Sequence, residues 1–111
     1  MIKIEVRKGE EVVETVTAYL TKHDIKTGVI VSVIGALNEF SLSSMDKHDE
    51  KKVITTEYTE AVELSGNGEI TDGKPHFHVT LGREDQQALH GHLEWGKVNE
   101  WFVHVYIMPL N

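Results

Sequence analysis

The sequence predicts an α+β fold, in which a mostly antiparallel sheet of six to eight strands packs against one main helix. Only residues 10–23 carry apolar side chains at the three- and four-residue spacing of an amphipathic helix. Most of the remaining chain alternates apolar and polar residues or forms short β-branched runs between turns, which is typical of strands. With 111 residues, 40% of them hydrophobic, the chain has the size and composition of one domain spanning residues 1–111.

The first predicted elements are a strand and the helix. The opening segment IKIEVR places Ile2, Ile4 and Val6 on one face, as in a half-buried strand, and Gly9 ends it. The segment EEVVETVTAYLTKH follows with helical spacing. Its first turn is acidic and its last turn is basic, which complements the helix dipole.

Strands account for the rest of the chain. The β-branched run TGVIVSVIGAL, between Gly28 and Gly35, predicts a strand buried on both faces, and LNEFSLSSM extends it with alternating residues. The segment KKVITTEYTEAVELSG indicates two further strands, and PHFHVTL, ALHGHLEW and NEWFVHVYIMPL complete the sheet. Gly66, Gly68 and Gly73 are assigned to turns.

The composition excludes several classes of protein. The formal net charge is −7, so the surface repels phosphate backbones, and generic binding to nucleic acid is not expected. The one local concentration of lysine, KHDEKK at residues 47–52, is interrupted by acidic residues and is interpreted as a solvated loop in preference to a binding patch.

No apolar run approaches the roughly 20 residues that span a bilayer, and the opening residues lack the apolar core of a secretory signal. We therefore expect a cytoplasmic protein without a membrane partner. Because the chain has no cysteine, any metal must be held by nitrogen and oxygen ligands.

Four of the seven histidines form two His-x-His pairs within GKPHFHVTLGREDQQALHGHLEW. Because side chains alternate across a strand, His76 and His78 share one face, opposite apolar residues. The same alternation puts His90, His92 and Glu94 on one face of the following strand. The polar turn GREDQQ is of hairpin size, so antiparallel pairing would bring both histidine pairs to the same outer face.

This arrangement requires a turn of odd length. If His76 pairs with His92, then His78 pairs with His90, and the turn is centred on Glu84. Gly82 could supply the positive φ that a bulge in this turn requires. Opposed Cβ atoms would lie about 4.5–5.5 Å apart, close enough for imidazoles to converge on an ion about 2.0–2.1 Å from each nitrogen. Two interpretations stay open: a site for zinc or another divalent transition metal, or histidines that only fill a polar face or an oligomer interface.

The same segment resembles the signature of the PPC ("plants and prokaryotes conserved") domain family, in which a Pro-His-x-His strand leads through a short polar turn to a Gly-Gly-His-Leu strand. VSVIGALNEFSLS is similar to the family's Ile-Gly-Ala-Leu segment, and EAVELSGNGEI to its Glu-Ile-Leu-x-Leu-Ser-Gly-Asn-Ile segment. Together these resemblances span about residues 29–93, and the leading strand and helix fit the family order.

The resemblance implies a stand-alone domain of prokaryotic type that assembles as a homotrimer. It also implies a transition metal, usually zinc, held by three histidines, which by motif are His76, His78 and His92. His90 stands where the family usually has glycine, so it could be a fourth ligand, a group behind the ligands or an incidental residue; the role of Glu94 is equally open. His104 is given no role beyond packing.

Three functions are compatible with these features. We favour a homotrimeric metal-binding module with a regulatory role and a small-molecule or protein partner. A zinc-dependent hydrolase or lyase would use Glu94 or Glu84 as general base, but the sequence offers no nucleophile elbow, phosphate loop or carboxylate dyad. A DNA-associated regulator acting through partners follows from the plant relatives, whose domain is preceded by an AT-hook; no such Arg-Gly-Arg-Pro segment occurs here. Trp95 and Trp101 are expected to anchor the core or a trimer interface.

Overall fold

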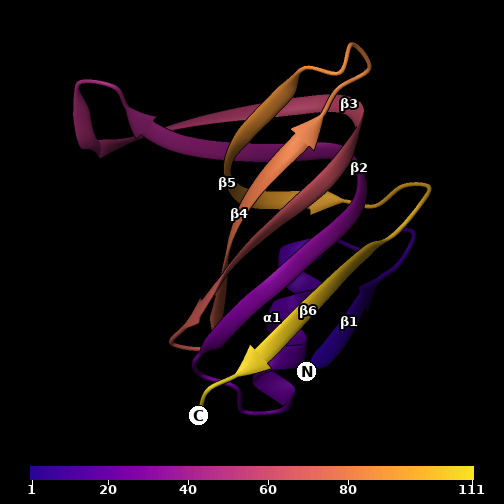
Figure 1. The fold of residues 1–111 in the computed structure, drawn as a ribbon, viewed down its shortest axis with the longest axis vertical. Helices are drawn as coiled ribbons and strands as arrows, with labels where there is room; N and C mark the ends of the chain where they lie inside the picture. Colours follow the sequence, from indigo (N-terminus) through magenta and orange to yellow (C-terminus); the bar gives the residue numbers. More distant parts are fainter.

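The computed structural model describes all 111 residues and contains one helix and six strands (Figure 1). In chain order, the elements are β1 (Ile2–Val6), α1 (Val12–Lys22), β2 (Gly28–Asp46), β3 (Asp49–Thr71), β4 (Lys74–Gly82), β5 (Ala88–Lys97) and β6 (Val103–Pro109). The predicted α+β class is therefore confirmed, as is its single main helix. No helix is long and apolar enough to cross a membrane.

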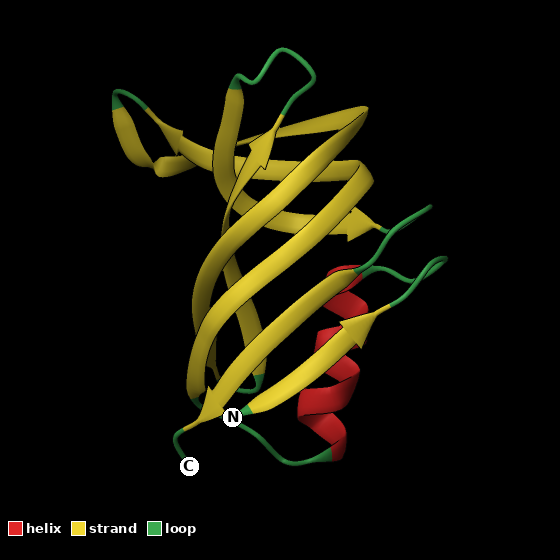
Figure 2. Cartoon of the chain, turned by 45° about the vertical axis from the view of Figure 1, so that its right-hand side comes forward, coloured by secondary structure: helices red, strands yellow, loops and turns green.

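All strand pairs are antiparallel, and the sheet has the order β1-β6-β2-β3-β4-β5. β5 also pairs with residues 39–43 of β2, so β2, β3, β4 and β5 close on themselves at one end of the molecule. At the other end, β6 and β1 continue the sheet beside the first half of β2. Figure 2 shows the result, an open sheet with α1 behind it that curls into a closed end.

Glu11 determines where α1 begins and where it docks. Its carboxylate accepts hydrogen bonds from the backbone N–H groups of Val13 (2.9 Å) and Glu14 (2.8 Å), which the helix itself leaves without partners. A third hydrogen bond, from the backbone N–H of Gly96 (2.7 Å), ties the same carboxylate to β5. The helix start and its contact with the sheet therefore depend on one side chain.

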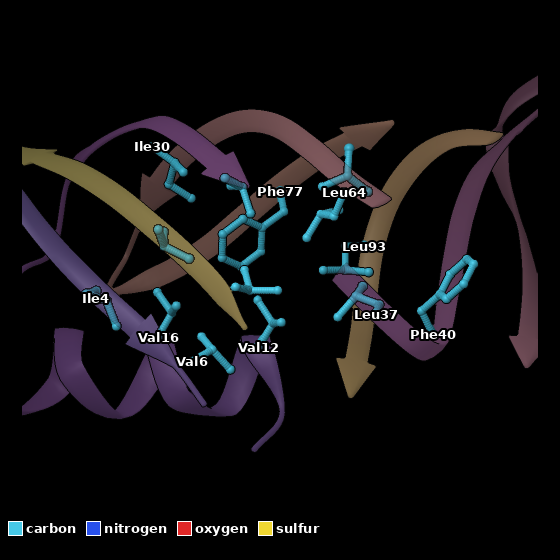
Figure 3. Packing of buried hydrophobic residues seen from close by; sticks show 14 of the residues in the cluster. Ile4, Val6, Val12, Val16, Ile30, Leu37, Phe40, Leu64, Phe77 and Leu93 are labelled. Atoms are coloured by element: carbon cyan, nitrogen blue, oxygen red, sulfur yellow. The ribbon is translucent and has the colours of Figure 1, made fainter. Parts of the chain in front are cut away.

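The core lies between α1 and the inner face of the sheet and continues into the closed end (Figure 3). Val12 and Val16 of the helix face Phe77 of β4 across the open part of the sheet. Leu37 and Leu93 fill the closed end. Because inner and outer positions alternate along each strand, every outer residue of β4 and β5 points away from this core.

β2 differs from the prediction of a strand buried on both faces. Its inner residues Ile30 and Val33 are fully buried. Its outer residues Val29, Val31 and Ile34 remain 38%, 45% and 51% exposed. The helix and the core residues lie on the inner side alone, so the apolar outer residues form a stripe that the chain itself does not cover.

β3 is one strand of 23 residues and not the two that the sequence indicates. Its bend is accommodated by a register shift against β2, between Leu37 and Glu39. Gly66 and Gly68 lie inside this strand, so their assignment to turns is wrong. Gly73, with a φ of 75°, does form the turn between β3 and β4.

The end of the β2–β3 hairpin extends beyond the closed end of the sheet as a two-stranded ribbon, residues 44–56, which we call the arm (Figure 1). All of its residues are exposed except Asp46, which is half-buried. The lysine-containing segment 47–52 forms the outer end of the arm.

Candidate histidine site

Both histidine pairs lie on the β4–β5 hairpin and face outward, away from the core. His78 lies opposite His92, and Thr80 lies opposite His90. The predicted pairing of His76 with His92 is therefore wrong by two residues. Because the shift is an even number, every side chain stays on its predicted face.

The turn between the two strands explains the shift. It contains the five residues from Arg83 to Gln87, and the Arg83 N–H donates a hydrogen bond to the Gln87 carbonyl (2.8 Å). The positive φ of the turn, 68°, lies at Gln86 and not at Gly82. The turn is thus odd in length, as predicted, but its centre is Asp85, one residue beyond the predicted centre.

His92 lies between the other two histidines that the motif selects. Its ring centroid is 5.9 Å from that of His76 and 5.8 Å from that of His78, with interplanar angles of 57° and 75°. His92 is half-buried, whereas His76 and His78 are exposed. Three imidazoles from two strands therefore meet on one patch of the outer face, which we call the histidine cluster.

His90 is held apart from the histidine cluster. Its Nδ1 forms a hydrogen bond of 2.8 Å with the hydroxyl of Thr80, the residue opposite it on β4. The side chain is exposed and stacks on none of the other histidines. His90 is thus paired with a hydroxyl in this conformation and does not contribute to the cluster.

Glu94 is fixed beside the cluster by a residue that the sequence analysis did not select. The hydroxyl of Ser43 donates a hydrogen bond of 2.6 Å to Oε1 of Glu94. Ser43 is only 6% exposed, and on β2 it lies opposite His92 of β5. Ser43 lies in the alternating segment LNEFSLSSM, and only the β2–β5 pairing brings it to the histidines.

The surroundings of His92 favour its neutral form. Burial lowers the pKa of His92 below its ordinary value of 6.5. The negative charge of Glu94 opposes this effect, while His76 and His78 lower the pKa further. A neutral imidazole keeps a nitrogen lone pair available to a metal ion or to a hydrogen-bond donor.

The donor set of the cluster fits a transition metal chemically, because imidazole nitrogens suit zinc, copper, iron and nickel. In the present conformation, however, no group of three or more His, Cys, Asp or Glu side chains is arranged to hold an ion. Convergence of the three rings on one point therefore requires side-chain rotation. His76 and His78 are exposed, so packing does not oppose that rotation.

Two other candidates lie away from the cluster. Glu84 is exposed in the β4–β5 turn, and the surface hollows that it lines contain no histidine. His104 belongs to β6 and stacks on Phe102, with ring centroids 4.2 Å apart.

The fold and the outward cluster define a small α+β domain with a polar surface site built on a β-hairpin. The family model for the Plants and Prokaryotes Conserved (PCC) domain matches residues 1–111, and the chain belongs to this family, also abbreviated PPC. A search of curated proteins found no match.

Solved structures of similar proteins share the fold over nearly the whole chain. A PPC protein of Pyrococcus horikoshii is 26% identical, with a TM-score of 0.81 over 99% of this chain and 78% of that one. The metal-containing protein AF0104 of Archaeoglobus fulgidus is 29% identical, with a TM-score of 0.81 over 99% and 79%. A candidate DNA-binding protein of Bacteroides thetaiotaomicron is 26% identical, with a TM-score of 0.80 over 98% and 78%.

Proposed function

We propose that this chain is a homotrimeric binding or regulatory module that holds a transition metal, zinc in first place, through His76, His78 and His92. The observation that carries the proposal is the meeting of these three imidazoles, with centroid separations of 5.8 and 5.9 Å, on one outer patch. The similarity to the metal-containing protein of Archaeoglobus fulgidus supports it.

The surroundings of the cluster suit a site that binds a small ligand. Three protein ligands leave zinc with an open position, where it polarises a bound water or anion. Ser43 holds Glu94 on the outer face, two residues from His92, and its carboxylate would be able to accept a proton or a hydrogen bond from a group bound at the site. These residues provide binding and orientation, which a regulatory module needs.

The apolar stripe on the outer face of β2 supports the trimer. Val29, Val31 and Ile34 are exposed there, and Met108 on the neighbouring β6 is 45% exposed. Contiguous exposed apolar surface on a small domain indicates association with another protein surface. In a homotrimer, each copy would cover the stripe of another.

The test is the metal content and the mass in solution of protein purified without a polyhistidine tag. We expect one metal ion per chain in the parent, none in His78→Ala, and an unchanged content in the matched variant His90→Ala, because His90 is bound to Thr80 outside the cluster. Mass measurement should give three chains. A parent free of metal after growth and refolding with zinc would refute the site, and a monomeric parent would refute the trimer.

A second candidate function is DNA-associated regulation through partners, which the similarity to the Bacteroides thetaiotaomicron protein favours. The net charge of −7 opposes direct contact with phosphates. Titration of the trimer with short duplexes at physiological salt separates the two functions: the module should show no binding, and saturable binding would favour the DNA-associated role.

A hydrolase or lyase is the third candidate, and Glu94 is the observation in its favour. It is the carboxylate nearest in register to His92 on the outer face, and Ser43 holds it in place. Catalysis would require turnover that disappears in both Glu94→Gln and His92→Ala, whereas a binding module loses only ligand affinity.

A further inference from the structure

The arm is exposed on both of its faces and carries apolar side chains on each. Met45 and Val53, opposite each other on one face, are 66% and 64% exposed. Ile54, opposite Ser44 on the other face, is 42% exposed. Figure 1 shows the ribbon extending from the body with no helix or strand beneath it.

Such a ribbon is not stable by its own contacts. An isolated two-stranded hairpin is marginal in water, because it has no hydrophobic face to bury. β3 pairs with β4 only from Glu63 onward, so the other edge of β3 along the arm has unpaired backbone groups. An edge of this kind, rich in β-branched residues, is a template for contact with another chain.

An apolar groove lies elsewhere on the outer face of the same chain. It has a volume of about 660 Å³, and its exposed apolar walls are Ile34 of β2, and Trp101 and Phe102 of the β5–β6 connection. Trp101 is 68% exposed and Phe102 is 41% exposed. The expected interface role of Trp101 therefore has a specific place, the wall of this groove.

The backbone holds the aromatic wall against β2. The carbonyl oxygen of Phe102 accepts a hydrogen bond from the N–H of Ala36 (3.0 Å). Gly35 has a φ of 153°, and a Cβ atom there would collide with the same carbonyl oxygen. The end of the β5–β6 connection at Phe102 is thus fixed against β2.

The arm cannot reach the groove of its own chain. Ile34 and Met45 lie eleven positions apart along β2, roughly 36 Å of strand at about 3.3 Å per residue. In Figure 1 the arm extends to the left, whereas the β5–β6 connection lies on the right. An arm that lies in this groove must therefore come from another copy of the chain.

The charges favour the arm of a second copy as that occupant. Residues 46–52 contain three acidic and three basic residues, so the net charge of −7 belongs to the rest of the chain. Contact between two acidic bodies is opposed by repulsion, whereas a neutral arm can approach an acidic body. Glu63 and Glu84 flank the groove, and the lysines at the end of the arm can face them: Lys47, Lys51 and Lys52.

The geometry points to an arm-in-groove contact, in which the face of one copy's arm that carries Met45 and Val53 lies in the groove of the next copy. A contact between two different surfaces, repeated around an axis, gives a closed ring when its rotation is a whole fraction of a turn, one third in a trimer. The inference rests on the proposed trimer, in which the three arms would each bridge to the neighbouring copy. It also accounts for part of the uncovered stripe, because Ile34 belongs to both stripe and groove.

The chain has no cysteine, so two introduced cysteines report on this contact alone. We would combine Val53→Cys on the arm with Ile34→Cys in the groove and treat the protein with a short bis-maleimide. We expect bands of two and three linked chains on a denaturing gel, because the reagent should link the arm of each copy to the groove of the neighbouring copy. Each single variant is the control and should remain at one chain.

A second measurement uses the mass in solution. We expect the triple variant Met45→Ser, Val53→Thr, Ile54→Thr to lose the trimer at concentrations where the parent and the arm control Thr55→Ser, Thr56→Ser retain it. All five positions are exposed, so folding should be unaffected, as circular dichroism can verify.

The outcomes separate the contact from the proposed function. A parent trimer whose double-cysteine variant stays at one chain, or whose triple variant remains trimeric, overturns the arm-in-groove contact and leaves the trimer and the metal site standing. A monomeric parent overturns both the contact and the trimer. The metal site is judged independently, by metal content.

Discussion

A Cβ atom on Gly68 of β3 would collide with the carbonyl oxygen of His76 on β4. The two residues are near neighbours in register, since Gly68 lies opposite Phe77 and Glu69 lies opposite His76. Gly66 stands in the same relation to His78. The two glycines therefore let the backbone of the histidine-bearing strand lie close against β3.

We predict that Gly68→Ala destabilises the protein by about 1–3 kcal/mol, because the added methyl group overpacks a backbone contact that cannot yield. It should also weaken metal binding, because β4 must move at His76. Urea unfolding and a metal-binding titration measure the two effects. Gly82→Ala, on the neighbouring strand β4, is the matched control, because the heavy atom nearest to an added Cβ there, the Glu63 carbonyl oxygen, is 3.9 Å away. Equal stability of the two alanine variants would contradict the prediction.

The alternation of side chains could be predicted from the sequence, but their register could not. Period-two alternation is local, so the outward placement of His76, His78 and His92 follows from the segment alone. The pairing depends on which residue of the turn takes the positive φ, and Gln86 does so although Gly82 is the better candidate by type.

Long-range relationships explain the remaining differences. Ser43 reaches Glu94 only because β2 pairs with both β3 and β5, and no local pattern encodes that closure. The outer face of β2 is apolar, and its composition would be the same if the chain itself covered that face or if another copy did. The exposure of Val31 was therefore not predictable from the sequence. Gly66 and Gly68 have the composition of a turn but serve a close approach of strands.

We predict that the imidazole of His92 titrates below 6.5 in metal-free protein, because burial disfavours its charged form. In Glu94→Gln the pKa should fall further, since the carboxylate raises it in the parent. NMR titration of the ring resonances measures both. A midpoint above 6.5 in the parent, or an upward shift in the variant, would show that burial does not dominate.

The same shift predicts how stability depends on pH. The unfolded chain binds a proton at His92 near pH 6.5, whereas the folded chain does so only at lower pH. Between these two values the unfolded state holds more protons, so His92 lowers the free energy of unfolding as the pH falls below 6.5. Urea unfolding without metal measures this effect. As the pH falls below 6.5, the free energy of unfolding should decrease less in His92→Gln than in the parent. Identical pH dependence would argue against the shift.

We predict that Glu11→Ala costs at least about 1–2 kcal/mol of stability, the upper part of the usual range for a helix N-cap. The loss should be large because three backbone N–H groups lose their acceptor, including that of Gly96 on β5. Glu14→Ala is the control, because the Glu14 side chain is exposed and accepts no hydrogen bond. Thermal unfolding of both variants measures the difference, and equal melting temperatures would show that the cap is not important.

We predict that Ser43→Ala weakens metal binding about 10–100-fold, the usual effect of removing a group that orients the surroundings of a metal. Without the hydroxyl, Glu94 loses its 2.6 Å hydrogen bond and can turn away from the cluster into solvent. Thr80→Ala is the matched control, since it removes a hydroxyl from the same face that is bound only to His90. The metal Kd, measured by competition with a chromogenic chelator, should change less than about threefold in this control, because His90 is not a ligand. A loss of affinity in Thr80→Ala equal to that in Ser43→Ala would mean that His90, and not Glu94, supports the metal.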